Sequence, residues 1–576
     1  MTSTPADSAD VSVINSSQLR CKGIATGDGR LGVEWLGHNL PERWPQLSMQ
    51  RVYLRARNTG ARTWRMQEGA DGGVIGLEVS AKDETRFFPA PHDVSPGSEV
   101  IFSFPFIVPF VSLGPQGELD LCITLVERTG TSRQPTGAPP LVLRMKTGPA
   151  ENNVTADAAL FAGLACSAFY LPSGGVLRGQ DGRPFPLFAR KASGCRVSDL
   201  EGNQWIDYVM GWGSALLGYA RPEISDAVRA ELDSGAVLGL PNFLELEVAQ
   251  LLGDLVPCAE MTLFGKNGSD VCTAAVRMAR VHTGRPSILF SGYSGWQEPF
   301  AQVFEPALEQ PGYPQTAFRF PTNDLAQARA LFERHAGQIA GVIIEPAAQV
   351  EGVDGPVREA DPAFLNGLAE LCRQHGALLI FDEIMTGFRY PGGSVQKATG
   401  VLPDLACFGK ALTSSMPLSV LVGRREIMRS VGRIFYHPTY RGEAYSFAAA
   451  AAALRIYQSQ DVPGQIGEFG TRLMTSINEL SRRIGMDGEM IGLPFRMVYR
   501  FNEPDQPRRT LMRTLLQQEL LKHGVLAFRG FMLPSTAHGE QELHETLAAF
   551  EAAFRRVQEV SAGDCFERHL EIPPIV

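Results

Sequence analysis

Runs of consecutive apolar residues alternate with stretches of helical spacing in the chain after about residue 160. Gly341–Glu345 (GVIIE) and Ala377–Asp382 (ALLIFD) are two such runs, and a helix is predicted between them near Pro362–His375. A strand that is apolar on both faces needs cover on both faces, and strands joined by helices are typical of parallel sheets. The pattern therefore predicts an α/β domain with a mostly parallel sheet between layers of helices.

The first 147 residues follow a different pattern. Short strands in which apolar and polar residues alternate are predicted at residues 52–56, Val74–Val79, Glu99–Phe106 and Leu119–Glu127. Frequent turns between short strands are typical of a β-sandwich of immunoglobulin-like type. We expect an all-β sandwich as an accessory domain at residues 1–147, followed by a polar linker at residues 148–158.

Composition argues against several classes of protein. The net charge of −9 and the lack of a Lys/Arg-rich face argue against nucleic-acid binding, and no run of about 20 apolar residues predicts a membrane helix. The N-terminus lacks the basic and apolar regions of a secretory signal. The nine cysteines form no CxxC pair, which indicates reduced thiols and no metal site. We therefore expect a cytoplasmic protein.

Polar groups follow two predicted strands and open one predicted helix. Asp382 ends an apolar run, and the C-terminal end of a strand is where α/β folds bind ligands. Lys410 follows the apolar residues 405–408 and a glycine, so its amine can point into a dry pocket, where its pKa is lowered. Gly268 and Ser269 precede the helical stretch Val271–His282, as in a turn that binds phosphate.

These groups match what pyridoxal 5′-phosphate (PLP) demands of a protein. Its aldehyde needs a lysine amine, its ring nitrogen needs a carboxylate, and its phosphate needs N–H groups and hydroxyls at a helix N-terminus. Taken singly, each motif also has an ordinary interpretation, as a helix cap, a surface loop or a turn. Their combination and their order along the chain favour a PLP site.

The segment from about residue 165 to 560 resembles the class III aminotransferases of PLP fold type I, and among them the glutamate-1-semialdehyde aminomutase group. The matching motifs are DLEGNQWIDYVMGWGSALLGYARPEI (199–224), LFGKNGSDVCTAAVRMAR (263–280), IIEPA (343–347), LLIFDEIMTGFR (378–389) and PDLACFGKALTSSMPLSVLVGRRE (403–426). The resemblance implies a large α/β domain and a smaller α+β C-terminal domain that folds against it.

The resemblance also implies roles around the cofactor ring. Lys410 would form the Schiff base with PLP and move the proton between carbon atoms, and Asp382 would pair with the ring nitrogen. Ile384 and Tyr293 would pack on opposite faces of the ring. Glu345 would lie behind the cofactor near its 3′-oxygen, with a cap at the end of its strand as the alternative.

Further expected contacts involve the phosphate, the substrate and a second copy of the chain. Gly268 and Ser269 would hold the phosphate, and Thr439 would reach it from the neighbouring subunit, which implies a homodimer with a shared active site. Trp212 falls where the family places an aromatic residue near the substrate, and a core tryptophan is the alternative. His538 lies in a C-terminal motif where a structural hydrogen bond is favoured.

Four residues depart from the family's pattern. Ser294 replaces the usual histidine beside Tyr293, and Arg441 stands where glycine is common, so both are candidates for substrate contacts. Ser414 and Ser415 replace glycines that usually follow the lysine, and we expect a stiffer loop there.

The sequence thus predicts a PLP-dependent aminotransferase that moves an amino group from a small-molecule donor to a carbonyl acceptor in sugar, glycan or secondary-metabolite biosynthesis. One alternative is a 2,1-aminomutase of glutamate-1-semialdehyde type, and another is a non-catalytic glycan- or carrier-binding protein on the same scaffold. Within the enzyme we expect an N-terminal segment at residues 159–235, a PLP-binding large domain at 236–473, and a small domain with its tail at 474–576. The β-domain would be an architectural or dimer-contact module, or would bind carbohydrate or a carrier.

Overall fold

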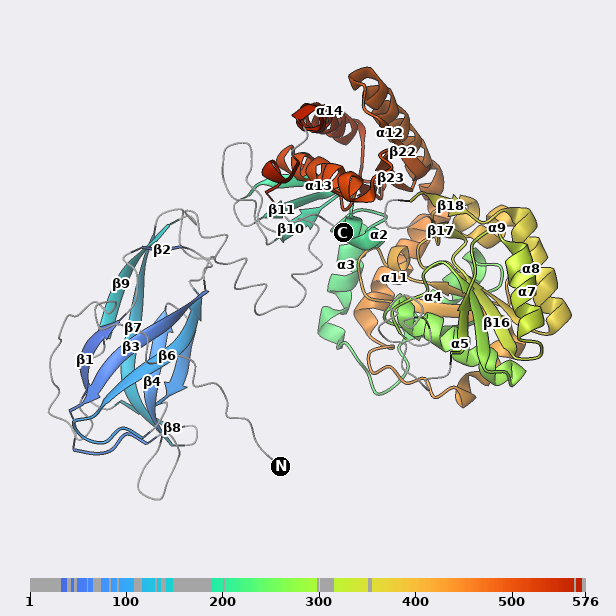
Figure 1. Ribbon diagram of the computed structural model, residues 1–576. Helices are drawn as coiled ribbons and strands as arrows, with labels where there is room; N and C mark the ends of the chain where they lie inside the picture. The colour runs from blue at the N-terminus through green and yellow to red at the C-terminus, as the bar shows by residue number, and fades with distance from the viewer. Residues whose placement is uncertain are drawn as a thin grey trace. The chain divides into compact units, whose positions relative to one another are not determined.

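The structure is a computed structural model. It describes residues 33–38, 43–45, 49–59, 61–65, 74–81, 84–90, 93–107, 117–129, 132–135, 141–148, 189–199, 202–297, 300, 315–350, 355–563 and 566–571. The chain divides into two compact units, Met1–Cys166 and Ser167–Val576 (Figure 1). The predicted linker lies outside the described residues apart from Gly148, so the predicted domain boundaries stay predictions.

The N-terminal unit contains two sheets. One has the strand order β1 (Val33–His38), β3 (Met49–Asn58), β6 (Glu99–Ile107). The other has the order β2 (Arg43–Pro45), β9 (Leu141–Gly148), β7 (Gly117–Thr129), β4 (Val74–Ala81), β5 (Glu84–Pro89), with β8 (Ser132–Pro135) paired to β7. All four predicted strands are confirmed, as parts of β3, β4, β6 and β7, and Leu54 and Ala56 are buried as their alternation predicts. The immunoglobulin-like packing of the two sheets stays a prediction.

Seven strands form the sheet of the large domain, and their direction positions the candidate site. Their order is β13 (Met261–Gly265), β21 (Ser419–Gly423), β20 (Leu405–Phe408), β19 (Leu378–Asp382), β16 (Ile339–Ile344), β14 (Ser287–Ser291), β15 (Ala317–Arg319). Strand β21 is antiparallel to both its neighbours, and the other pairings are parallel. The sheet is therefore mixed but mostly parallel, as predicted. Every strand except β21 runs the same way, so their C-terminal ends meet at one end of the sheet.

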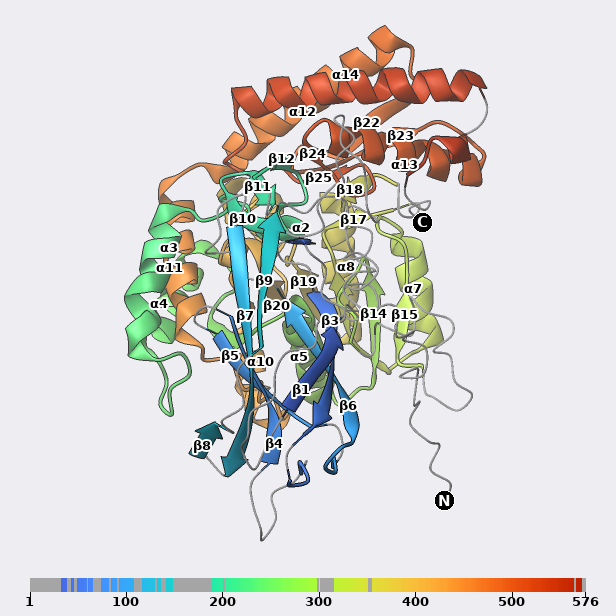
Figure 2. The ribbon, with the colours of Figure 1, turned by 90° about the vertical axis from the view of Figure 1, so that its left-hand side faces the viewer.

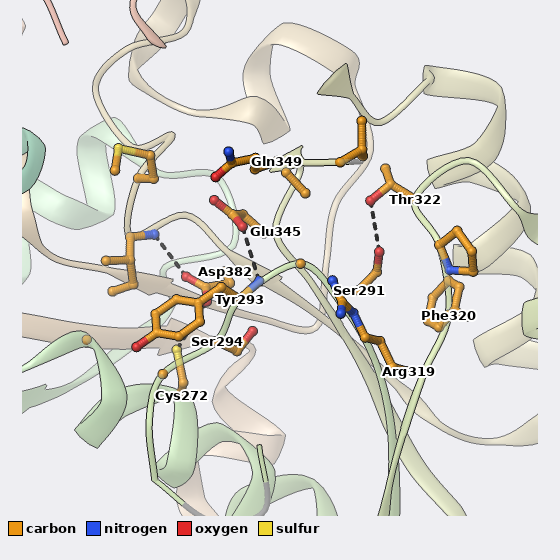
Figure 3. Close-up of a pocket in the computed structure, with 18 of the residues that line it drawn as sticks. Cys272, Ser291, Tyr293, Ser294, Arg319, Phe320, Thr322, Glu345, Gln349 and Asp382 are labelled. Atoms are coloured by element: carbon orange, nitrogen blue, oxygen red, sulfur yellow. Dashed lines mark hydrogen bonds between the residues drawn. The ribbon is translucent and has the colours of Figure 1, made fainter. Parts of the chain in front are cut away.

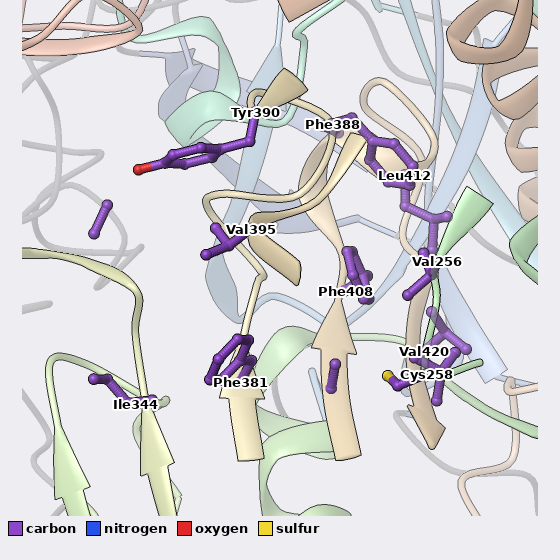
Figure 4. Packing of buried hydrophobic residues seen from close by; sticks show 14 of the residues in the cluster. Val256, Cys258, Ile344, Phe381, Phe388, Tyr390, Val395, Phe408, Leu412 and Val420 are labelled. Carbon is purple, nitrogen blue, oxygen red and sulfur yellow. The ribbon is translucent and has the colours of Figure 1, made fainter. Parts of the chain in front are cut away.

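Helices cover both faces of this sheet, because side chains along the central strands alternate between two buried cores. Ile343 belongs to the core that contains α5 (Gly268–Thr283). Phe381 and Phe408, on the neighbouring strands β19 and β20, belong to the opposite core with α8 (Pro362–His375), as Figure 4 shows. Helix α8 confirms the helix predicted at these residues. Burial of a large apolar side chain contributes roughly 1.5–3 kcal/mol, so the two cores fix the strand ends. The same opposite core includes α4 (Phe243–Leu255), α7 (Leu325–Arg334) and α11 (Ala444–Ser459).

The C-terminal part of the second unit has a separate buried core. Helices α12 (Val462–Ile484), α13 (Gln506–Lys522) and α14 (Glu540–Gly563) pack beside a three-stranded sheet of order β22 (Gly488–Leu493), β23 (Arg496–Phe501), β25 (Phe531–Met532) (Figure 2). A second sheet has the order β10 (Ala189–Ser193), β11 (Arg196–Asp199), β12 (Gln204–Asp207), β24 (Val525–Leu526). Helices α13 and α14 supply many of the side chains of this core. In the described stretches, no helix combines the length and the apolar character that crossing a membrane requires.

Candidate active site

A cavity of about 1000 Å³ lies at the C-terminal ends of the large-domain strands. Eight of the residues predicted for the cofactor and substrate line it, namely Gly268, Ser269, Tyr293, Ser294, Glu345, Asp382, Ile384 and Lys410. Figure 3 shows Asp382, Tyr293, Ser294 and Cys272 close together, with Arg319, Phe320 and Thr322 farther along the wall. Segments that are far apart in the sequence therefore contribute to one wall, because their strands are parallel and end together.

Lys410 enters this cavity from a tight turn after β20. Gly409 is its N-terminal neighbour, and Lys410 has φ +45°, in the left-handed region that non-glycine residues rarely adopt. Tyr457 steadies the turn, since its hydroxyl donates to the carbonyl oxygen of Ala411 at 2.7 Å. Burial, together with the positive charge of Arg496, lowers the pKa of Lys410 to about 8, so a minority of the amine is already neutral near physiological pH.

Asp382 is the last residue of β19 and is buried. Its Oδ1 accepts a hydrogen bond from the backbone N–H of Ile384 at 3.1 Å, and its Oδ2 accepts one from the Cys272 thiol at 3.4 Å. Burial raises the pKa of Asp382 to about 6, with a further contribution from the nearby negative charge of Glu345, whereas these hydrogen bonds oppose the rise. At neutral pH the group is therefore mostly a carboxylate.

Glu345 follows β16 and links three parts of the wall. Its Oε2 accepts from the backbone N–H of Tyr293 at 3.2 Å, and its Oε1 pairs with Arg496 Nη1 at 2.6 Å. Gly292, with φ +93°, permits this approach, because a Cβ at that position would lie 2.5 Å from the Cβ of Glu345. Glu345 is thus bonded to a loop and to the C-terminal part, and it is not a simple cap of its own strand.

The start of α5 forms a cradle at the cavity wall. Asp270 closes the turn before the helix, since its Oδ2 accepts from the backbone N–H of Asn267 at 2.8 Å. A Cβ added at Gly268 would lie 3.1 Å from the Ile384 side chain, and one at Gly295 would lie 2.6 Å from the Ser269 hydroxyl. The space that two glycines leave open beside a hydroxyl and a helix N-terminus suits a phosphate group.

Three predicted residues do not line the cavity of a single chain. Trp212 is 50% exposed and meets the ring of Phe528 edge-on at a centroid distance of 5.0 Å, so the alternative of a core tryptophan is wrong. Thr439 and Arg441 are exposed on the segment before α11.

His538 does not line the cavity either. It is buried elsewhere and is hydrogen-bonded to Ser535. Burial lowers the pKa of His538 to about 4.

Sequence reasoning missed several polar residues of the cavity wall, and two of them contact the predicted cofactor residues. Cys272 lies one turn into α5, and Arg496 begins β23 in the C-terminal part. No motif marks Arg496, because its position depends on how the C-terminal part packs against the large domain. For Cys272 the helical spacing after Ser269 was a usable signal, since residues three apart share a helix face.

Comparison with known proteins agrees with this geometry. Residues 178–551 match the family model for aminotransferase class-III. This chain belongs to the class III aminotransferase family. The chain is 34% identical over 409 residues to glutamate-1-semialdehyde 2,1-aminomutase 2 of an Exiguobacterium species, covering 65% of the chain and 91% of the relative. It is 33% identical to glutamate-1-semialdehyde 2,1-aminomutase of Syntrophobacter fumaroxidans, covering 66% and 92%.

Solved structures of PLP-binding proteins and aminotransferases share the fold. The FumI protein of Sphingopyxis sp. MTA144, in its PLP internal aldimine form, has a TM-score of 0.65 at 26% identity and covers 74% of this chain and 99% of its own. A β-phenylalanine aminotransferase of Variovorax paradoxus has a TM-score of 0.60 at 25% identity, with 72% and 95% covered. The chain is therefore a PLP-dependent enzyme, and the alternative of a non-catalytic binding protein is not supported.

The wall of the cavity fits this cofactor. An amine with a lowered pKa, a buried carboxylate and an open glycine cradle at a helix N-terminus meet in one space. They are the three groups that PLP requires. Among the described residues, no cluster of three or more His, Cys, Asp or Glu side chains could hold a metal ion.

Proposed function

We propose that this enzyme is an aminotransferase that moves an amino group from a small-molecule donor to a separate carbonyl acceptor, in the biosynthesis of sugars, glycans or secondary metabolites. The observation that carries the proposal is the presence of Lys410 and Asp382 in the wall of one cavity. When bound, PLP supplies an aldehyde that condenses with amines and a ring that withdraws electrons from the attached carbon. The remaining steps are tasks for the residues of the chain.

Lys410 is proposed to hold the cofactor and then to move the proton. A neutral amine is needed for both tasks, and the pKa of about 8 makes the neutral form accessible near pH 7 to 8. Once a donor amine has displaced it, Lys410 Nζ would take the proton from the amine-bearing carbon of the donor and would deliver it to the cofactor carbon that carried the aldehyde. The turn that places Lys410 at the end of β20 orients this amine toward the cavity.

Asp382 is proposed to pair with the ring nitrogen and keep it protonated. Ile384 and Tyr293 are proposed to contact the two faces of the ring, and Glu345 to lie near its 3′-oxygen. The Tyr293 backbone is tied to Glu345, and Ile384 to Asp382, through the hydrogen bonds described above. The groups that would hold the ring are therefore fixed to one another before the cofactor binds.

Gly268 and Ser269 are proposed to bind the phosphate at the start of α5, and Thr439 of a second copy to complete the site. The segments around residues 237 and 443 are bridged to each other and both expose apolar side chains. Leu240 is 79% exposed and Phe243 is 75% exposed. Apolar groups of this size are normally covered by a partner, which supports a homodimer in which the exposed Thr439 meets the neighbouring cavity.

Ser294, Arg441 and Trp212 remain proposed substrate residues. Ser294 lines the cavity, at the position where the family pattern described above has histidine, and Trp212 is exposed rather than packed in a core. A changed side chain at the cavity wall supports a substrate that differs from glutamate-1-semialdehyde. The two curated relatives named above support the aminomutase instead, and it is therefore the second candidate.

The two candidates are separated by the need for an amino donor. Purified enzyme is mixed with a panel of amines and amino acids, the loss of the visible band of bound PLP is recorded, and products are identified after addition of carbonyl compounds. An aminotransferase converts the carbonyl compound only when a separate donor is supplied. Efficient turnover of glutamate-1-semialdehyde alone would favour the aminomutase. A Lys410→Ala variant is expected to lose the band and more than about 1,000-fold of activity.

A further inference from the structure

The Cys272 thiol is buried between helix α5 and the ends of β19 and β20. Its Sγ lies 3.4 Å from Oδ2 of Asp382, and it lines the same cavity as Lys410. Cys272 is 1% exposed and Asp382 is 3% exposed, so the contact between them is shielded from water. A buried carboxylate oxygen without a donor is costly, and the thiol supplies that donor.

The thiol is in its protonated, donating form at neutral pH. A hydrogen bond with the neighbouring Cys407 raises the pKa of Cys272 well above its usual value, and burial and the charge of Asp382 raise it further. Such a thiol is a poor nucleophile and a poor candidate for oxidation chemistry. Its remaining capability is to donate a hydrogen bond through S–H.

The position of Cys272 along α5 adds a second argument. It lies three residues after Ser269, so both side chains are on one face of the helix, and both line the cavity. Oδ1 of Asp382 is already bonded to the backbone of Ile384, and the thiol engages Oδ2. Together the two bonds fix the rotation of the carboxylate, and the same helix that would hold the phosphate sets one of them.

We propose that Cys272 is a positioning residue for the cofactor ring: its thiol donates to Oδ2 of Asp382 and holds that carboxylate ionised and correctly turned toward the ring nitrogen. The inference rests on the proposed role of Asp382. It assigns to helix α5 the task of aligning both ends of the cofactor, the phosphate through its first turn and the ring nitrogen through Cys272 and Asp382.

Three variants test the inference in the full-length protein. Cys272→Ala removes the donor, Cys272→Val removes it while filling the space, and Cys272→Ser restores a donor. Cys372→Ala is the matched control, since Cys372 is a similarly buried thiol on helix α8. The readouts are the dissociation constant of PLP, measured by titrating cofactor-free protein, and the pH at which the visible band of bound PLP is half lost on acidification.

We expect Cys272→Ala and Cys272→Val to raise the dissociation constant about tenfold, as for loss of a hydrogen bond to a charged group, and to move the half-loss point to higher pH. The dissociation constant of Cys272→Ser should stay within about threefold of the wild-type value. That of Cys372→Ala should equal the wild-type value. The titratable groups that also face Asp382 are Glu345, Glu383, Tyr293, Cys407 and Lys410, and they are the same in all variants.

The outcomes separate this inference from the proposed function. If both Cys272→Ala and Cys272→Val bind PLP and titrate as wild type does, while Asp382→Asn loses affinity and the band, the inference is wrong and the role of Asp382 stands. If Asp382→Asn also behaves as wild type, the proposed role of Asp382 is wrong. Should the alanine variant fail to fold, the valine variant decides, and equal effects of valine and serine would point to packing and overturn the hydrogen-bond role.

Discussion

Arg496 Nη1 lies 2.6 Å from Glu345 Oε1, and this ion pair joins the first residue of β23 to the end of β16. The side chains are only 12% and 8% exposed, so the charges compensate each other in a setting of low dielectric. Arg496 also bonds the carbonyl oxygen of Ala347 at 3.1 Å. The pair therefore connects the C-terminal part to the cavity wall and places a positive charge near Lys410.

The first prediction concerns loss of this pair. Arg496→Met leaves Glu345 buried and unpaired, which is expected to destabilise the cofactor-free protein by about 3 kcal/mol. The pKa of Lys410 should rise, because Arg496 no longer opposes its protonation. Thermal unfolding and the pH dependence of PLP incorporation measure the two effects. The double variant Arg496→Met with Glu345→Gln is the control and should recover most of the stability. An unchanged melting temperature in the single variant would contradict the role of the pair.

The second prediction concerns the pH dependence of cofactor incorporation. If Lys410 forms the Schiff base as proposed, its neutral amine is the reacting form, and a lowered pKa means that this form prevails above about pH 8 rather than above pH 10. The rate at which cofactor-free protein takes up PLP, followed by stopped-flow absorbance, should therefore rise with pH and level off above about pH 8. Arg496→Met should shift this plateau to higher pH. A wild-type rate that still rises steeply between pH 9 and 10 would exclude a lowered pKa.

Much of this site could be predicted because its residues follow apolar strands. Asp382, Glu345 and Lys410 each lie at or near the end of a strand. Parallel strands bring such ends together, independently of the conformation of the connecting loops. Arg496 could not be found in this way. It begins an antiparallel strand of another sheet, and its contact with Glu345 depends on packing between parts of the chain that are about 150 residues apart.

The β-strands of the N-terminal unit could also be predicted from the sequence, since the alternation of apolar and polar residues fixes which side chains face inward, as at Leu54 and Ala56. The environment of Trp212 could not be predicted in this way. Gly211 and Trp212 both have φ of +58°, a left-handed conformation that helical or strand periodicity does not predict. Whether Thr439 meets a second copy, as proposed above, also depends on that second chain and not on local pattern.

The third prediction concerns the ion pair between Lys266 and Glu443, at 2.7 Å and with both side chains nearly buried. It connects the turn before α5 to the N-terminus of α11, where Glu443 also accepts from the backbone N–H groups of Tyr445 and Ser446. Burial disfavours the charge of Glu443, but the hydrogen bonds from Lys266 and Ser446 outweigh it and lower its pKa. The stabilisation is thus present above the unfolded pKa of about 4.3 and is lost as pH falls through the lower folded value.

Lys266→Met should accordingly destabilise the protein by about 3 kcal/mol at pH 7, and the difference from wild type should shrink as the pH approaches 4. Urea unfolding at several pH values measures this. Glu443→Gln in the Lys266→Met background is the control, because glutamine keeps an acceptor for the helix N-terminus and removes the unpaired charge. A deficit that does not change with pH would show that the pair contributes through packing alone.

The fourth prediction concerns the exposed apolar side chains of Leu240 and Phe243. If a second copy covers them, Leu240→Asp with Phe243→Asp should give monomers in light scattering, because charges would be buried at the contact. PLP affinity should fall at least about tenfold, since Thr439 of the neighbour would be lost from the phosphate. Leu402→Asp is the matched control, with a side chain that is also exposed but belongs to the segment before β20. A double variant that remains dimeric would refute this contact surface.

The fifth prediction concerns the two serines after the lysine turn, which adopt left-handed backbone conformations. Ser415 has φ +103° and Ser414 has φ +48°. Ser415→Gly should stabilise the protein by about 1 kcal/mol, because glycine adopts this conformation without strain. Ser414→Gly should instead destabilise it, since the Ser414 hydroxyl accepts from the backbone N–H of Leu217 at 3.2 Å and donates to the carbonyl oxygen of Gly218 at 3.4 Å.

Thermal unfolding should therefore show a gain in stability for one glycine variant and a loss for the other, although the two positions are adjacent. The comparison separates backbone strain from hydrogen bonding, because the two substitutions add the same freedom to the unfolded chain. If both variants are destabilised to the same extent, unfolded-state entropy dominates and the strain at Ser415 is too small to matter. If Ser415→Gly is more stable than Ser414→Gly, the backbone at Ser415 is strained. The serine then stiffens the turn after Lys410 at some cost in stability.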